Sequence, residues 1–441
     1  MPAPLATEKP TTDNKLNPDF WKFWAGETIS TLGGSFTGFA LPLLVYKLTG
    51  SAVDLAIATA AFFLPYLIFG LVIGAWVDRM DRKRLMITVD VLRALIIGTV
   101  PLLAAFGGLS VWWIYSVLFI TSTLGIFFQS AQFAAVPSLV SKDDLITANG
   151  RLLASYETAR IIGPLLAGLL VVVVPVEDLL VFDALSFLVS SLALSLIRTS
   201  FNEIKREGKS TNIRQEIGEG LRYVWGHPVL RNISLMMALV NFVSVTVGAQ
   251  RVLYAKERFA ASDSEIGILY AAGSAGVVLL SLLAGKARKR WPFSKVILGT
   301  LMISGLMTTL FALTPWYWVA LPLWALISGF GMLLNINTNS LRQTIVPNHM
   351  LGRVMSIAGV VAWSSNPLGA YLGGLAIEWT HDVVLVYAVI GILGVLIPLA
   401  FAFTALGRAE QYLPNKEQEP PPEQPAKEEA SPEFEEAVAS S

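Results

Sequence analysis

The stretch GAWVDRMDRKR at residues 74–84 concentrates charge between two long apolar runs. Each of these runs, residues 52–77 and 85–106, is long enough to cross the hydrocarbon core of a bilayer as an α-helix. The charged stretch is therefore expected to form a tight turn at a helix end on a membrane surface. A second basic stretch, AGKARKR at residues 284–290, follows roughly 200 residues later and indicates two related halves.

The composition extends this interpretation to the whole chain. Of 441 residues, 54% are apolar and only 15% are charged, whereas about a quarter of the residues of a soluble domain are charged. This balance excludes a soluble enzyme. Twelve apolar segments are expected to cross the bilayer, near residues 20–46, 52–77, 85–106, 110–136, 147–174, 177–198, 230–255, 262–284, 294–313, 316–341, 353–378 and 382–405.

Repeated strings divide these segments into two sets of six. VPSLV at residues 136–140 matches IVPNHMLGR at 345–353, and GPLLAG at 163–168 matches NPLGAYLGG at 366–374. The predicted fold is thus an all-α integral membrane protein with twelve transmembrane helices in two six-helix bundles. A parallel repeat of this kind places a polar cavity between two halves that can rock about it.

The remaining segments connect or flank the bundles. The expected organisation is a cytoplasmic amino-terminal tail (1–19), the first bundle (20–198), a cytoplasmic linker (199–229), the second bundle (230–406) and an acidic cytoplasmic tail (407–441). The last segment is rich in Pro and Glu and is predicted to be disordered, because it cannot bury enough apolar surface to offset its ordering entropy.

Orientation follows from the distribution of Lys and Arg over the loops. One alternate set of loops holds nineteen of them, and the other holds Lys47, Lys256 and Arg258. Cationic loops stay in the cytoplasm during insertion. Both termini are therefore predicted to be cytoplasmic, in a multi-pass protein of the cell (inner) membrane.

Metal and cofactor chemistry has little support in the sequence. The chain contains no cysteine, which excludes disulfides, thiolate metal sites and cysteine nucleophiles. Its three histidines, His227, His349 and His381, fall far apart in connecting segments and lack ligand spacing. We expect no metal, no cofactor and no nucleic-acid partner.

Several strings resemble a known family. FWAGETISTLG, YKLTGSAVDLA, VDRMDRKRLMITVDVLRA, VPSLVSKDDLITANGRL, ARIIGPLLAGLL and LGRVMSI are similar to the bacterial exporter branch of the major facilitator superfamily, which contains macrolide efflux proteins and the enterobactin exporter. The resemblance covers about residues 20–406. It implies the fold described above and export of a small molecule.

The resemblance also implies roles for two motifs. The loop between the second and third helices resembles a gating motif, in which Asp78 would cap a helix of the opposite half and bond to a nearby Arg. Topology alone is the other interpretation of this loop. The Gly-Pro pair of the fifth helix resembles an antiporter packing motif. The corresponding residues are, for gating, Gly74, Asp78, Arg79, Arg82, Lys83 and Arg84 and, for helix packing, Gly163, Pro164 and Gly168.

The sequence departs from the family pattern at two points. Asp81 stands where the gating motif usually has Gly, and the fourth helix offers Gln129 and Gln132 where many drug antiporters have an Arg.

Charged residues within the apolar segments need a partner, water or a function, because an isolated charge in hydrocarbon is costly. Asp90 with Arg93 and Glu157 with Arg160 are three residues apart and are predicted to form local pairs, with ligand binding as the lesser alternative. Glu27 and Asp183 are the candidates for proton coupling; a hydrogen-bonded structural acid is the other interpretation of Glu27.

Polar side chains at intramembrane depth are candidates for the cavity. They can instead join neighbouring helices, and Arg251 can instead be a cation that extends to the interface. The candidates are Gln129, Gln132, Asn241, Gln250, Arg251, Asn335 and Asn339.

The predicted function is secondary active export of an amphipathic, drug-like or macrolide-like compound by alternating access, with protons as the coupling ion. We expect a monomer whose partners are its small-molecule substrate, protons and the lipid bilayer. A siderophore or metabolite exporter of the same superfamily and a non-transporting membrane receptor are the alternatives. An ATP-driven enzyme is not expected, because a complete phosphate-loop motif is lacking.

Overall fold

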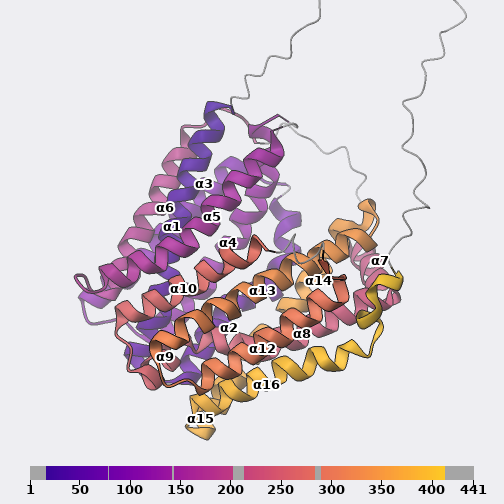
Figure 1. The fold of residues 1–441 in the computed structure, drawn as a ribbon. Coiled ribbons are helices and arrows are strands. Elements are labelled where there is room, and N and C mark those ends of the chain that lie inside the picture. Colours follow the sequence, from indigo (N-terminus) through magenta and orange to yellow (C-terminus); the bar gives the residue numbers. More distant parts are fainter. Residues whose placement is uncertain (1–15, 78, 142–143, 202–212, 284–289, 413–441) are drawn as a thin grey trace, which may run out of the picture.

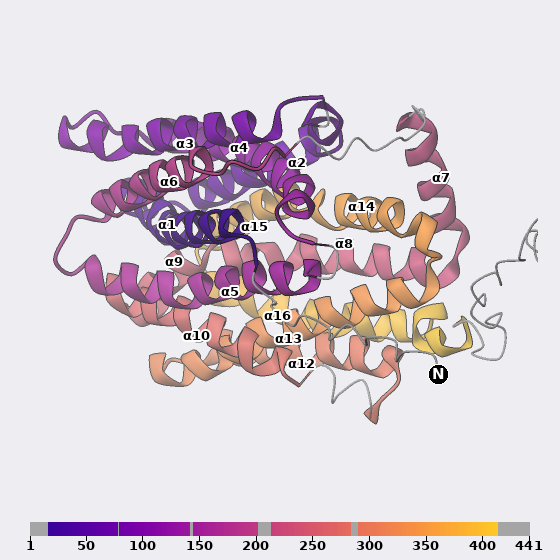
Figure 2. The same ribbon diagram turned by 90° about the horizontal axis from the view of Figure 1, so that it is seen from above.

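The computed structural model describes residues 16–77, 79–141, 144–201, 213–283 and 290–412. Within these ranges all regular structure is helical, which confirms the predicted fold class. The first half contains α1 (Pro18–Thr49), α2 (Ala52–Val77), α3 (Arg82–Ala105), α4 (Val111–Leu139), α5 (Leu145–Leu170), the short η1 (Val176–Asp178) and α6 (Leu179–Ser195). The amphipathic α7 (Ile213–Gly226) follows and lies across one end of the molecule (Figure 2).

The second half repeats this arrangement with two interruptions. Its helices are α8 (Pro228–Ala249), α9 (Arg251–Phe259), α10 (Asp263–Ser281), α12 (Phe293–Leu313), α13 (Tyr317–Ile345), α14 (Asn348–Trp363), α15 (Asn366–Thr380) and α16 (Val383–Ala402), with η2 (Ala405–Tyr412) after them. The expected helices at 230–255 and 353–378 are each broken, at Gln250 and at Ser364–Ser365. Pro367 in the first turn of α15 accounts for the second break, because proline has no backbone N–H to donate to the carbonyl group of Trp363, four residues earlier.

Local chemistry accounts for the helix ends. Asp81 accepts a hydrogen bond from the backbone N–H of Arg84 at 2.9 Å and so caps the start of α3. Ser262 and Glu265 form a reciprocal capping box at the start of α10. Gly50 ends α1 in the left-handed conformation, at φ +62°.

Ten of the described helices are long and apolar enough to cross a membrane. The two expected spans outside this set are α5, which carries Arg151, Glu157 and Arg160, and the α14–α15 segment, which consists of two shorter helices.

The two halves form bundles that diverge from a shared end, as Figure 1 shows. We call the end that carries Pro18, α7 and η2 the linker end, and the opposite end, with the turn at Gly50, the far end. Between the halves, α5 packs on α10 and α2 packs on α15. The first of these contacts is backbone to backbone, because a Cβ at Gly168 would lie 2.7 Å from the Cα of Gly267.

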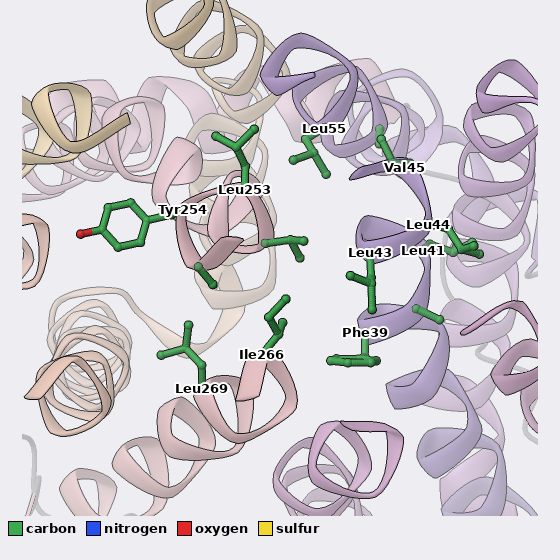
Figure 3. Packing of buried hydrophobic residues seen from close by; sticks show 14 of the residues in the cluster. Phe39, Leu41, Leu43, Leu44, Val45, Leu55, Leu253, Tyr254, Ile266 and Leu269 are labelled. Atoms are coloured by element: carbon green, nitrogen blue, oxygen red, sulfur yellow. The ribbon is translucent and has the colours of Figure 1, made fainter. Parts of the chain in front are cut away.

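Among the described residues, the large buried apolar cluster that joins the halves lies at the far end. This cluster unites α1 and α2 with α9 and α10, and Figure 3 shows Phe39 and Leu43 of α1 directed toward Ile266 of α10. At the linker end the described residues form two main clusters, one built from residues 16–201 and one from residues 224–409. In the described part of the chain, the halves are thus sealed together by one cluster at the far end and have separate clusters at the linker end.

Polar contacts reinforce the far-end seal. Lys47 of α1 forms an ion pair with Asp263 of α10, with Nζ and the carboxylate oxygen 2.6 Å apart. Lys256 of α9 approaches the same carboxylate at 2.6 Å. Because Lys47 belongs to the first half and Asp263 to the second, this pair must break if the far end opens.

Candidate functional site

One cavity is lined entirely by residues of the second half. Its volume is about 530 Å³, which falls in the range of pockets for drug-sized ligands. Four of the predicted cavity residues line it: Asn241 of α8, Arg251 of α9, and Asn335 and Asn339 of α13. The rest of its wall is largely apolar and includes Met237, Leu301, Trp324, Leu334 and Ile390.

A second cavity, of about 250 Å³, connects this pocket with the first half. The two cavities share Arg251, Trp324 and Ser328, and the second is also lined by Ser35 of α1 and Arg160 of α5. Together they form a space that reaches from the second bundle to the α5–α10 contact.

Arg251 is held between two aromatic rings. The centre of its guanidinium lies 4.2 Å from the ring centroid of Tyr270 and 4.5 Å from that of Trp324. Cation–π contacts of this kind favour a desolvated cation. Arg251 thus lies among aromatic side chains and lines both cavities, which favours its interpretation as a cavity residue over that of a cation that extends to the interface.

The amides of α13 form a chain of hydrogen bonds. Asn339 donates to the side-chain oxygen of Asn335 at 2.9 Å, and Arg342 donates to the side-chain oxygen of Asn339 at 3.4 Å. Arg342 is buried and lines the cavity. Arg342 is not among the cavity candidates predicted from the sequence, although its position three residues after Asn339 on one helix face was a usable signal.

Gln250 does not line either described cavity, which corrects its assignment as a cavity residue. It is fully buried at the break between α8 and α9, and its Nε2 donates to the backbone oxygen of Ala52 at 2.7 Å. Because Ala52 begins α2, this hydrogen bond connects the two halves at the far end.

Gln129 and Gln132 of α4 also lie outside both described cavities. Gln129 is exposed, whereas Gln132 is half-buried and forms a hydrogen bond with Glu27 of α1. Of these two amides, Gln132 thus contributes to the charge cluster described next.

The first half contains a charge cluster formed by the half-buried Glu27 and Arg93 and the buried Asp90 and Asp183. The Arg93 guanidinium lies between the rings of Phe128 and Phe187, at 5.3 and 5.2 Å from their centroids. The predicted Asp90–Arg93 pair is present with an N–O distance of 3.9 Å. Three acids therefore surround one cation.

Hydroxyl groups hold Asp183 within this cluster. One of its carboxylate oxygens accepts a hydrogen bond from Thr37 of α1, and the other accepts one from Ser186 at 3.3 Å. Glu157 and Arg160, the other predicted pair, contact each other along α5 at 3.4 Å and are not part of the cluster.

The charged turn between α2 and α3 is only partly described. Gly74 lies in α2 and Asp78 lies outside the described residues, so the expected bond of Asp78 to the opposite half is not visible. Arg79 is exposed in the turn. Arg84 is also exposed and forms an ion pair with Asp81 at 3.7 Å.

Two cations of this turn contact the end of α6 in their own half. Lys83 donates to the backbone oxygen of Ile197 at 2.5 Å and of Ser195 at 3.4 Å, and Arg82 donates to that of Phe201 at 3.0 Å. The carbonyl groups at a helix carboxyl end attract cations. This turn therefore holds α3 against the start of the linker.

The predicted packing motif of α5 lies at helix contacts. Gly163 faces Ser35 of α1 so closely that an added Cβ would overlap the serine side chain. Pro164 and Gly168 adjoin Gly267 of α10, which places this part of the motif at the contact between the halves.

Comparison with known proteins agrees with this architecture. Residues 16–432 match the family described as transmembrane secretion effector. The chain is 30% identical to the multidrug efflux pump Tap of Mycolicibacterium fortuitum over 373 residues, which cover 82% of this chain and 90% of that protein. It is 26% identical to macrolide efflux protein A of Streptococcus pyogenes over 365 residues, with the same coverage of each chain.

Solved structures share the fold at low sequence identity. A bacterial homologue of the human lysosomal transporter Spinster, in an inward-facing and unoccupied conformation, aligns with a TM-score of 0.71 at 15% identity and covers 90% of this chain and 98% of its own. A bacterial homologue of the iron transporter ferroportin, in an inward-facing state, aligns with a TM-score of 0.62 at 17% identity, covering 87% and 98%.

These matches extend across both bundles and the linker and agree with the helical repeat and its cavity. The chain belongs to the transmembrane secretion effector family of major facilitator transporters, and is therefore a multi-pass membrane transporter and not an enzyme.

Proposed function

We propose that this protein is a secondary active exporter, which moves a small amphipathic organic compound out of the cell by alternating access in exchange for protons. The observation that carries the proposal is the asymmetry of the two ends. The halves share one apolar cluster at the far end and have separate clusters at the linker end. A cavity of about 530 Å³ lies between these ends.

In the proposed orientation the linker end faces the cytoplasm. The linker and most basic turns gather there, and cationic loops are retained on that side during insertion. The structure then corresponds to a conformation open to the cytoplasm. Export requires the far-end seal between the halves to part while the linker end closes.

The two helix contacts between the halves suit such a rocking motion. At α5–α10, glycine backbones touch without intervening side chains, and at α2–α15, a Cβ at Gly374 would lie 2.6 Å from the Cβ of Ala56. Smooth surfaces of small residues let helices approach closely. We propose that these contacts persist as pivots while the ends open and close.

We propose the charge cluster of the first half as the proton site. Glu27, Asp90 and Asp183 surround a single cation, Arg93. With all three acids ionised, the cluster would carry an excess of negative charge away from bulk water, which is costly. Uptake of a proton by Glu27 or Asp183 would relieve this excess, and its release on the other side would complete the exchange.

The gating role of the charged turn is also a proposal. In the described conformation Arg82 and Lys83 bind backbone oxygens at and beyond the end of α6. We propose that these contacts position the turn so that Asp78 can cap a helix of the other half when the linker end closes. Asp78→Asn would then abolish export at normal membrane abundance, and unchanged export would contradict the latch.

The names of the relatives suggest substrates to test. Uptake into inverted membrane vesicles should be measured for macrolides, dyes and catechol siderophores, with and without a pH gradient, against vesicles from cells that lack the chain. Exporter activity predicts uptake that depends on both the protein and the gradient, and that is lost in Glu27→Gln or Asp183→Asn. Equal uptake in vesicles without the chain would favour a non-transporting receptor.

A further inference from the structure

The charges of the two halves are distributed unequally around the transport path. The acids Glu27, Asp90 and Asp183 are gathered in the first half, where Arg93 is their common neighbour. Within the described part of the chain, the residues that line the two cavities include Arg160, Arg251 and Arg342 but contain no Asp or Glu. Arg160 has a partner in Glu157 on its own helix.

Arg251 and Arg342 retain unused hydrogen-bond donors. The buried Nε of Arg251 and the buried Nη2 of Arg342 lack hydrogen-bond acceptors among the described residues. An arginine remains charged in proteins, and a buried charged donor without an acceptor is costly. Two such groups on the wall of one cavity therefore indicate that a bound ligand supplies the missing hydrogen-bond acceptors.

The aromatic contacts of Arg251 involve the faces of its guanidinium group and not the edge that carries its donors. Tyr270 and Trp324 lie against the guanidinium, with ring centroids at 4.2 and 4.5 Å. Rings interact with the faces of a guanidinium, whereas its N–H donors point outward in its own plane. The rings thus fix the group without satisfying its donors, and a planar carboxylate matches such a fork of donors.

The two arginines stand at different depths of the cavity. Arg251 contacts Trp324 near the start of α13, while Arg342 lies in the last turn of that helix. At 1.5 Å per residue, Trp324 and Arg342 are roughly 27 Å apart along the axis. One acidic group cannot contact both arginines at once, so Arg342 stands near the open linker end and Arg251 near the closed far end.

We infer that the transported compound is an amphipathic organic anion, whose acidic group passes Arg342 and binds Arg251 while its apolar body lies along the wall between them. This inference rests on the proposed export function and specifies its substrate class. A cationic drug fits this site poorly, because the described lining residues include these two arginines and no acid, which would repel a positive charge.

A series of probes that differ only in charge tests the inference. Pyrenebutyrate, pyrenebutanamide and pyrenebutyl-trimethylammonium share one apolar body and carry a negative, zero and positive charge. Saturable binding of each should be measured by quenching of tryptophan fluorescence, with the full chain in lipid nanodiscs and empty nanodiscs as the background. The wild-type chain should bind the acid at least about tenfold more tightly than the amide or the cation.

Arginine variants then locate the binding. Arg251→Gln should weaken binding of the acid by about 10- to 100-fold, because a hydrogen bond to a charged group is lost. Arg342→Gln should change the equilibrium affinity much less, because the bound acid does not contact Arg342, and should mainly slow association of the acid. Arg251→Lys should retain part of the affinity. Arg231→Gln is the matched control, since Arg231 is exposed at the start of α8 and is not among the cavity-lining residues.

Preference for the cation, equal affinity for the three probes, or failure of the acid to bind would each overturn the inference. These results use the wild-type chain, so they stand even where a variant misfolds. Binding is measured without a gradient, which separates this test from that of export. A chain that exports the cation but does not bind the acid would keep the proposed function and lose the inference. A chain that binds the acid with this preference but exports none of the three probes would keep the binding preference and lose the proposed function.

Discussion

Replacing Gln250 by Leu should shift the protein toward opening of the far end. Gln250 is fully buried, and its Nε2 donates to the backbone oxygen of Ala52 in the other half at 2.7 Å. A hydrogen bond of this kind contributes about 1 kcal/mol net. The side-chain oxygen of Gln250 accepts no hydrogen bond from the described residues. The substitution therefore breaks one hydrogen bond, and the expected loss for the closed far end is that of a single bond.

A change of about 1 kcal/mol alters the ratio of closed to open far ends roughly fivefold. This ratio can be measured from electron–electron distances between spin labels. The chain contains no native cysteine, so labels can be placed on Phe106→Cys and Trp316→Cys, which replace exposed residues near the far end of the first and the second half.

Tyr254→Phe is the matched control for this measurement. The Tyr254 hydroxyl is buried at the same end, but it donates to Phe311 and Ala312 within its own half. It should change overall stability without changing the distance distribution. The reasoning is refuted if Gln250→Leu leaves the distribution unchanged, or if Tyr254→Phe shifts it as much.

Three further predictions follow from individual contacts. Gly168→Leu should abolish export at normal membrane abundance, because its Cβ would meet the α10 backbone; Gly34→Leu, with open space around the same atom, should not. Lys83→Met should lower the free energy of unfolding, measured by thermal unfolding, by about 1–2 kcal/mol, because backbone oxygens near the end of α6 lose their donor. Arg84→Met is the control: Arg84 is exposed, and its replacement should change this free energy by less than about 0.5 kcal/mol. Burial lowers the pKa of His227, which caps α8. The imidazole therefore binds a proton more readily in the unfolded chain, and the free energy of unfolding should fall as pH drops below about 6.5. His227→Asn, which keeps a capping group, should remove that part of the pH dependence.

The helix plan was predictable because each span is encoded locally. Apolar length, capping residues such as Asp81 and Ser262, and the repeat of charged turns all act within a few residues of where they occur. The broken helices show the limit of this reasoning. Pro367 was a local signal for the break before α15, but the break at Gln250 depends on a hydrogen bond to Ala52, which is distant in the sequence.

The candidate site was predictable in residue type but only partly in place. Asn241, Arg251, Asn335 and Asn339 line the cavity, because polar residues inside an apolar helix must face something other than lipid. Gln250 and Gln132 also avoid lipid, but in other ways. Gln250 forms a hydrogen bond between the halves, and Gln132 forms one with Glu27. Which of these solutions a side chain takes depends on how helices far apart in the sequence pack, and periodicity does not contain that information.

The central claim is that the far end must open for transport to occur. Lys47 and Asp263, which form an ion pair across the halves at 2.6 Å, can be replaced by cysteines and bridged with a short, reducible bis-methanethiosulfonate linker, and export can be followed in vesicles before and after bridging. We predict that bridging abolishes export and that reduction restores it, while either single-cysteine variant treated in the same way keeps its activity. Export that continues at the original rate through a fully bridged protein would contradict alternating access in this chain.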